Sequence, residues 1–267
     1  MPLQNKRIQL DGACPPEPHP HSPPLSAPVS ERAPQAAVTV PAYLEQVYWW
    51  AYVHPNAVRI FEREWLVNLI LFGNYAKLRD AAVRELGTAA AGTTLQVACV
   101  YGDLTPRVHQ CIASDGALHV VDVLPIQLQN LRKKLPADAR VSLFQRDSAS
   151  LGFLDACYER ALVFFLLHEQ PESVRRQTLA EVYRVTKPGG KTVLVDYHRP
   201  HRWNPLRHPM QALLRRLEPY AEDLWQQELT HYFPADAGFS SVSKKTYFGG
   251  LYQKVVLVRS AAGMKDE

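Results

Sequence analysis

Short apolar runs alternate with amphipathic segments from Leu95 to Arg259, which is the pattern of an α/β sheet covered by helices on both faces. The runs that predict strands lie at 95–100, 118–123, 141–147, 159–170 and 191–198. Apolar side chains at helical spacing predict helices at 125–135 and 171–190. Two further runs, on either side of Gly249 and Gly250, predict a closing hairpin.

The chain before the sheet divides into two parts. Residues 1–40 are rich in proline and alanine and predict a disordered tail, because proline removes backbone donors and few apolar side chains remain to bury. Residues 41–90 predict a helical, aromatic cap. Its segment from Tyr43 to Tyr52 predicts either a helix docked on the core or a lid over a flat ligand.

In the second part of the cap, four apolar residues recur at helical spacing and predict a helix: Phe61, Trp65, Leu69 and Phe72. We expect these side chains to join the core rather than to anchor a membrane. The pair Gly73 and Asn74 predicts a break into two helices.

The composition narrows the class of protein. A net charge of +4 over 267 residues is too mild to indicate nucleic-acid binding. The four cysteines have no zinc-type spacing and predict reduced thiols of an intracellular protein. No apolar run approaches the roughly 20 residues that a spanning helix needs. We therefore expect a soluble or peripheral protein.

The stretch FFLLHEQPESVRRQTLAEVYRVTKPGGKTVLVDY, from Phe164 to Tyr197, resembles the strand-helix-KPGG-strand block of class I S-adenosylmethionine-dependent methyltransferases, especially those that modify quinones. The resemblance implies a Rossmann-like, seven-stranded, mostly parallel sheet with an antiparallel last strand. It assigns residues 91–260 to a cofactor-binding α/β domain with an insertion at 199–232, leaving 261–267 as a tail.

Two further stretches, YWWAYVHP at 48–55 and LQVACVYGDLTPRV at 95–108, resemble the rhodoquinone biosynthesis family, RquA. Members of that family are similar to methyltransferases but convert ubiquinone to rhodoquinone, replacing a ring methoxy group with an amino group. The resemblance implies S-adenosylmethionine as the amino donor and a divalent metal, with manganese favoured.

The first turn of the domain departs from the methyltransferase pattern acid-x-Gly-x-Gly-x-Gly. Alignment on that pattern places Gln96 at the acid, Ala98 and Val100 at two glycines, Tyr101 beside them, and Gly102 at the third glycine. A carboxylate beside an ammonium raises the pKa of the amine, whereas an attacking amine must be neutral. We therefore hypothesise that Gln96 helps to keep the cofactor amine reactive. The alternative is a methyltransferase relic without activity.

The other cofactor contacts that the resemblance implies follow the pattern. Asp122 ends the second strand, where an acid accepts hydrogen bonds from ribose hydroxyls. Asp147, followed by Ser148, ends the third strand, at the position that usually contacts the adenine amine. We expect Gly102 to line the cleft by close backbone approach.

Candidate catalytic residues follow the fourth and fifth strands, because open α/β sheets bind ligands at the carboxyl ends of their strands. They are His168, Glu169, Tyr197 and His198. A metal set of Asp196, His198 and His201 would suit manganese. A metal could polarise a quinone carbonyl; alternatively His168 or His198 moves protons.

The insertion carries arginines, Trp203 and a run of apolar positions at helical spacing from Met210 to Leu217. This basic amphipathic pattern predicts either a cap helix packed on the domain or a surface element on anionic lipid. Because a ubiquinone tail is too apolar to leave the bilayer readily, we expect peripheral association with the cytoplasmic face of the inner membrane. Two other functions stay open: a conventional quinone methyltransferase, and a non-catalytic partner in a quinone-modifying assembly.

Overall fold

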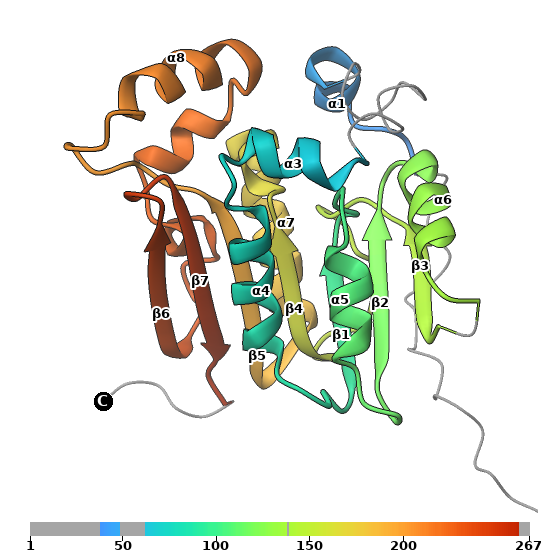
Figure 1. The fold of residues 1–267 in the computed structure, drawn as a ribbon. Helices are drawn as coiled ribbons and strands as arrows, with labels where there is room; N and C mark the ends of the chain where they lie inside the picture. The colour runs from blue at the N-terminus through green and yellow to red at the C-terminus, as the bar shows by residue number, and fades with distance from the viewer. Residues whose placement is uncertain (1–37, 49–61, 138, 262–267) are drawn as a thin grey trace, which may run out of the picture.

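A seven-stranded sheet runs through the computed structural model, in the order β3-β2-β1-β4-β5-β7-β6 (Figure 1). The structure describes residues 38–48, 62–137 and 139–261. The strands are β1 (Thr93–Val97), β2 (Ala117–Asp122), β3 (Val141–Gln145), β4 (Tyr158–Phe164), β5 (Thr186–Tyr197), β6 (Phe239–Tyr247) and β7 (Tyr252–Arg259). Strands β1 to β5 are parallel, and β7 is antiparallel to both of its neighbours. This arrangement confirms the predicted α/β fold.

Helices cover both faces of the sheet (Figure 1). They are α1 (Ala42–Val47), α3 (Glu64–Ile70), α4 (Tyr75–Leu86), α5 (Leu104–Gln110), α6 (Pro125–Lys134), α7 (Glu172–Val185) and α8 (Arg207–Leu217), with short 3₁₀ turns η2 (Leu167–Glu169), η3 (Ala221–Trp225) and η4 (Leu229–Tyr232). One apolar core joins α4, α5, α6 and α8 to the sheet, and a second joins α7, η3 and η4 to its other face.

Strands β1 and β4 end earlier than the apolar runs predicted, because the next residues leave the extended conformation. Ala98 follows β1 with a φ of +72°, and Phe165 follows β4 with a φ of +50°. Helix α7 likewise ends at Val185, before the KPGG turn, which forms the start of β5.

The break predicted at Gly73 and Asn74 is confirmed, since α3 ends at Ile70 and α4 begins at Tyr75. Asn74 Nδ2 donates to the carbonyls of Leu71 and Phe72 and fixes the bend. The expectation that the apolar face of the first of these helices joins the core is wrong. Helix α3 has no buried residue, and the large side chains on and next to it are exposed: Trp65, Leu69, Ile70 and Phe72.

Residues 1–37 of the predicted tail and residues 49–52 of the aromatic segment lie outside the described residues. The described part of the aromatic segment forms α1, with Leu44 and Tyr48 buried and Tyr43 lining a cavity. None of the helices in the described ranges is long and apolar enough to cross a membrane.

Candidate functional site

A cavity of about 740 Å³ lies at the carboxyl ends of the parallel strands, closed by residues of α1, α3 and α8. Its walls are mostly apolar. The charged side chains among the described residues that line it are Asp122, Arg146, Asp147, His168, Glu169 and Glu218. This edge is where open α/β sheets bind their ligands.

Most of the residues predicted to contact the cofactor line this cavity, namely Ala98, Val100, Tyr101, Asp122, Asp147 and Ser148. Gln96 and Gly102 are not among its lining residues. Gly102 has a φ of +85°, and a Cβ there would lie 2.5 Å from the hydroxyl oxygen of Tyr75. The glycine therefore admits Tyr75, whose hydroxyl accepts a hydrogen bond from the Leu104 amide at 3.1 Å.

Asp122 is held at the end of β2 by backbone donors. Its carboxylate accepts hydrogen bonds from the Cys99 amide at 2.7 Å and the Leu124 amide at 2.8 Å. Burial raises the pKa of Asp122 to about 6, although these hydrogen bonds oppose the shift. The contacts fix the carboxylate between the first two strand ends, where it faces the cavity.

Gln96 is fully buried beneath the turn that follows β1. Its Nε2 donates to the Ala98 carbonyl at 3.0 Å and to Thr105 Oγ1 at 2.9 Å. Its Oε1 has no hydrogen-bond partner among the residues that the structure describes. The Gln96 side chain therefore holds the Ala98 carbonyl by a hydrogen bond and does not line the cavity.

Two carboxylates flank this turn, and each is held by cations. Asp103 lies 2.6 Å from Arg79 and 3.0 Å from Arg107. Burial raises the pKa of Asp103, but the two arginines outweigh burial and leave that pKa below its usual value. Glu62 accepts from the Gly102 amide at 3.3 Å and pairs with Lys134 at 2.7 Å. The β1–α5 turn therefore combines a neutral Gln96 with carboxylates that are already paired.

Ala98 takes a left-handed conformation that favours glycine, so we expect Ala98→Gly to stabilise the fold. Glycine would remove about 1 kcal/mol of backbone strain at this φ. That gain is slightly larger than the roughly 0.5–1 kcal/mol of conformational entropy that a glycine costs on folding. Thermal unfolding should shift upward by about 1–2 °C. Ala156→Gly, at a φ of +51° outside the cavity lining, is the matched control and should behave alike. A lower melting temperature for Ala98→Gly alone would contradict a strained turn.

The third and fourth strand ends supply further polar groups. Asp147 accepts a hydrogen bond from the Ala149 amide at 2.9 Å. Ser148 Oγ lies 2.9 Å from Thr178 Oγ1 and accepts from Gln170 at 3.0 Å. These contacts fix a polar patch at one end of the otherwise apolar cavity.

Three of the four predicted catalytic residues, His168, Glu169 and Tyr197, meet in the cavity. His168 Nδ1 lies 2.9 Å from Asp196 Oδ1, and Nε2 lies 3.7 Å from Glu169 Oε1. The Tyr197 ring packs edge-on against the imidazole, with 4.9 Å between centroids. Burial lowers the pKa of His168, but Asp196 outweighs burial and raises it to about 9. The Asp196 carboxylate therefore favours the protonated form of the imidazole.

Asp196 is a fully buried anchor of this cluster. Its Oδ2 accepts from the Leu167 amide at 2.9 Å, and its Oδ1 accepts from the Tyr197 amide at 2.7 Å. The carboxylate thus ties η2 to the end of β5 while it pairs with His168.

Glu218 belongs to the same cluster, although the sequence analysis did not identify it. It follows the last residue of α8 and lines the cavity. Burial raises the pKa of Glu218, and the nearby His168 opposes the shift. The sequence feature that could have identified Glu218 is its position as an acidic residue at the end of a basic amphipathic helix.

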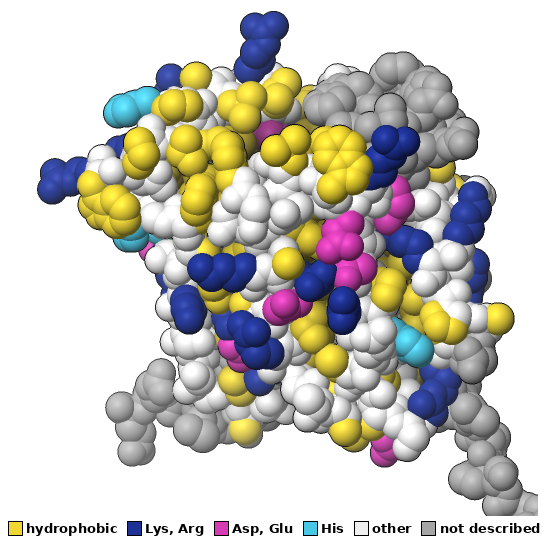
Figure 2. Space-filling view, viewed as in Figure 1, with side chains coloured by type: hydrophobic (Ala, Val, Ile, Leu, Met, Phe, Trp, Pro, Cys, Tyr) yellow, Lys and Arg dark blue, Asp and Glu magenta, His cyan; other side chains and the backbone are white. Residues whose placement is uncertain are grey.

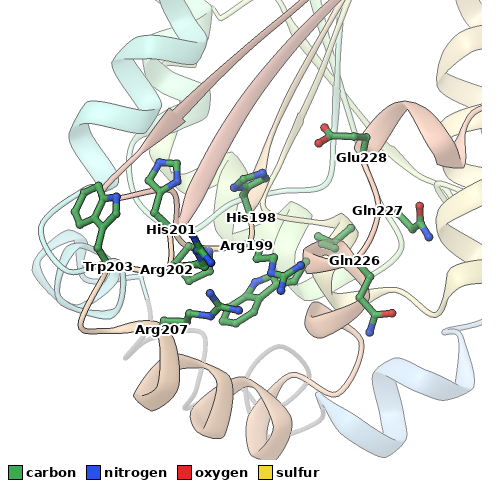
Figure 3. Close-up of a pocket in the computed structure, with 12 residues that line it drawn as sticks. His198, Arg199, His201, Arg202, Trp203, Arg207, Gln226, Gln227 and Glu228 are labelled. Carbon is green, nitrogen blue, oxygen red and sulfur yellow. The ribbon is translucent and has the colours of Figure 1, made fainter.

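The proposed metal set does not converge. His198 Nδ1 faces the Gly250 carbonyl at 2.7 Å, His201 stacks on Trp203, and Asp196 is engaged with His168. Across the described residues no group of three or more histidine, cysteine or acidic side chains is arranged to hold a metal ion. His198 and His201 instead line a separate pocket on the outer side of the 198–207 loop (Figure 3).

Comparison with known proteins agrees with this architecture. Residues 94–190 match a family described as a methyltransferase domain. Demethylmenaquinone methyltransferase from Shouchella clausii is 25% identical over 224 residues, which cover 74% of this chain and 92% of that protein.

Two solved structures share the fold. Human N-acetylserotonin methyltransferase in complex with S-adenosylmethionine has a TM-score of 0.57 at 13% identity, covering 83% of this chain and 61% of that one. A SAM-dependent methyltransferase from Aquifex aeolicus has a TM-score of 0.51 at 16% identity, covering 77% and 98%. The chain therefore has the fold of these methyltransferases, and its residues 94–190 are similar to a methyltransferase domain.

Proposed function

We propose that this protein converts ubiquinone to rhodoquinone, replacing a ring methoxy group with an amino group that S-adenosylmethionine supplies. The observation that carries the proposal is the β1–α5 turn, where the methyltransferase acid is replaced by the buried, neutral Gln96. Asp103 and Glu62, which flank the turn, are paired with cations. An amine without a carboxylate partner keeps a lower pKa, so more of it is the neutral nucleophile.

The cavity is suited to the adenosyl half of this cofactor. Asp122 would accept hydrogen bonds from the ribose hydroxyls, and Asp147 with Ser148 would face the adenine. The departure from the methyltransferase pattern is confined to the end where the amine would lie.

A quinone substrate is supported by the relatives and by the apolar walls. The curated relative from Shouchella clausii is named for a quinone precursor. In this chain the rings of Phe164, Phe165 and Tyr197 line the cavity beside His168. Aromatic and aliphatic walls with a few convergent polar groups are typical of sites for flat, apolar ligands.

His168 and Glu218 are suited to the proton transfers of this substitution. The His168 cation would donate a hydrogen bond to a quinone carbonyl oxygen, which makes the methoxy-bearing carbon more electrophilic. The cofactor amine would form the carbon–nitrogen bond as the carbon–oxygen bond to methoxide breaks. A later elimination, in which a Cβ proton of the cofactor leaves and its Cα–N bond breaks, would free the aminoquinone, which takes up a proton on nitrogen. Glu218, whose pKa burial raises, would accept the amine proton, which finally leaves on methanol.

Asp196→Asn should shift the upper limb of the pH profile to lower pH. The folded pKa of His168, about 9, lies above its ordinary value of 6.5, so the protonated form and its stabilisation are lost as pH rises through about 9. Without the Asp196 charge, that loss should begin nearer 6.5. The rate–pH profiles of both proteins on short-chain ubiquinone test this, and coincident upper limbs would remove His168 as the titrating donor.

The proposed setting is the cytoplasmic face of the inner membrane, where a peripheral enzyme would meet its lipid quinone. The structure supports the cap-helix prediction for α8, and contact of this helix with lipid stays a prediction. Met210 and Leu214 of α8 are buried in the core, whereas Leu213 and Leu217 are exposed. Arg215, expected at the lipid surface, pairs with Glu222 at 2.8 Å.

A conventional methyltransferase acting on a quinone is the second candidate, and the match of residues 94–190 to the methyltransferase family favours it. The products distinguish the two. We expect purified protein with S-adenosylmethionine, manganese and a short-chain ubiquinone to yield an aminoquinone and methanol. A methylated quinone with S-adenosylhomocysteine would favour the second candidate instead.

A further inference from the structure

A second pocket of about 700 Å³ lies outside the cavity described above, along the loop between β5 and α8 (Figure 3). Three arginines, Arg199, Arg202 and Arg207, line it. None of the three has a side-chain hydrogen bond or ion pair within the part of the chain that the structure describes. Glu228, the single carboxylate among the described lining residues, is held by Lys244 at 2.6 Å. The pocket therefore presents unpaired positive charge.

The start of α8 adds little to this charge. The Leu206 and Arg207 amides donate to Asn204, and Pro209 has no amide hydrogen. Arginine side chains bind phosphate oxygens in a bidentate manner. The three arginines are therefore the feature of the pocket that favours a phosphate group.

The loop that carries the arginines is fixed on the sheet. The His201 amide donates to the Gly249 carbonyl at 2.9 Å, and Asn204 Nδ2 donates to the Phe248 carbonyl at 3.0 Å. Trp203 is 75% exposed and stacks on His201, with 5.4 Å between ring centroids. An exposed tryptophan beside arginines is typical of residues at a membrane interface.

An apolar rim connects this pocket to the mouth of the catalytic cavity. Phe248, on the turn that holds the loop, stacks on Phe72 at 5.9 Å. Figure 2 shows hydrophobic side chains gathered over α3 and α8 at the same end of the molecule. The exposed members of this rim are Trp65, Leu69, Ile70, Phe72, Leu213, Leu217 and Phe248. Large contiguous apolar surfaces mark interaction sites.

We propose that the pocket of Arg199, Arg202 and Arg207 binds the phosphate of an anionic lipid headgroup, with Trp203 at the level of the interface. This contact would hold the rim against the bilayer and the cavity mouth toward a membrane-borne substrate. The assignment rests on the membrane partner in the proposed function and gives that partner a defined site.

The test is sedimentation with vesicles of phosphatidylcholine, with and without about one-third phosphatidylglycerol. Arginines near such a surface contribute roughly a fivefold increase in affinity each, so the triple change of Arg199, Arg202 and Arg207 to Gln should weaken binding on the order of a hundredfold. The matched control removes three exposed cations elsewhere, through Arg84→Gln, Arg132→Gln and Lys133→Gln. We expect that control to stay within a few-fold of the unaltered protein.

Equal losses in the two triple variants would overturn the proposal, because binding would then follow net charge alone. Binding of inorganic phosphate to the pocket, without any preference of the protein for anionic vesicles, would assign the site to a soluble phosphate instead. Turnover of short-chain ubiquinone in detergent is measured separately: its absence contradicts the proposed reaction, whereas the vesicle result decides the lipid site.

Discussion

His168→Gln is expected to lower kcat for quinone amination by about 10²- to 10⁴-fold, the range for removal of a positioned proton donor. The glutamine keeps much of the volume and a hydrogen-bond donor but loses the charge that Asp196 stabilises at 2.9 Å. Because the quinone would still bind against Phe165 and Tyr197, we expect KM to change far less than kcat. Steady-state kinetics on short-chain ubiquinone gives both constants.

The control is His119→Gln, which removes another buried imidazole. His119 contacts the Tyr158 hydroxyl at 3.0 Å and does not line the cavity. Thermal unfolding of both variants separates a loss of stability from a loss of chemistry. If His168→Gln keeps the kcat of the unaltered protein, the assignment of His168 as the proton donor is wrong.

Gln96→Asp is expected to suppress amination at neutral pH and to restore it as pH rises. A carboxylate under the turn would raise the pKa of the cofactor amine, and each unit of that increase lowers the neutral fraction about tenfold. A loss of about 10- to 100-fold near neutrality should therefore shrink at higher pH. Binding of S-adenosylmethionine should tighten at the same time, because its ammonium gains a partner.

Gln96→Asn is the matched control, since it shares the shape of Gln96→Asp but carries no charge. Both variants shorten the side chain that donates to Ala98 and Thr105, so both should lose stability to a similar degree. Only the aspartate should change the pH dependence. Coincident pH profiles would show that the neutral residue at this position does not tune the amine.

The fold was predictable because burial on both faces of a parallel sheet imposes continuous apolar runs, and those runs alternate with helical spacing along this chain. The strand ends were less predictable. Ala98 and Phe165 leave the extended conformation although neither is a glycine. Residues that normally avoid positive φ are held there by the surrounding contacts, which a local pattern does not reveal.

The site could be predicted where topology alone brings residues together. Asp122 and Tyr197 end parallel strands and His168 follows another, so they meet at one edge. Side-chain direction could not be predicted in the same way. His198 directly follows Tyr197 but lines the other pocket, because neighbouring positions at the end of a strand point to opposite faces.

Two features of the site depend on tertiary packing. Glu218 reaches the cavity only because α8 folds back over the strand ends. Those strand ends are far from Glu218 in the sequence. The exposure of α3 was not apparent either, since an apolar helical face has the same spacing whether it meets a core or a surface partner.

In the proposed reaction the cofactor amine, rather than its methyl group, is transferred. S-adenosylmethionine labelled with heavy nitrogen in its amino group, incubated with the protein, manganese and a short-chain ubiquinone, tests this directly by mass spectrometry of the quinone. We predict an aminoquinone that carries the heavy nitrogen, together with methanol. Transfer of the methyl group, with release of S-adenosylhomocysteine, or the absence of any product would contradict the account.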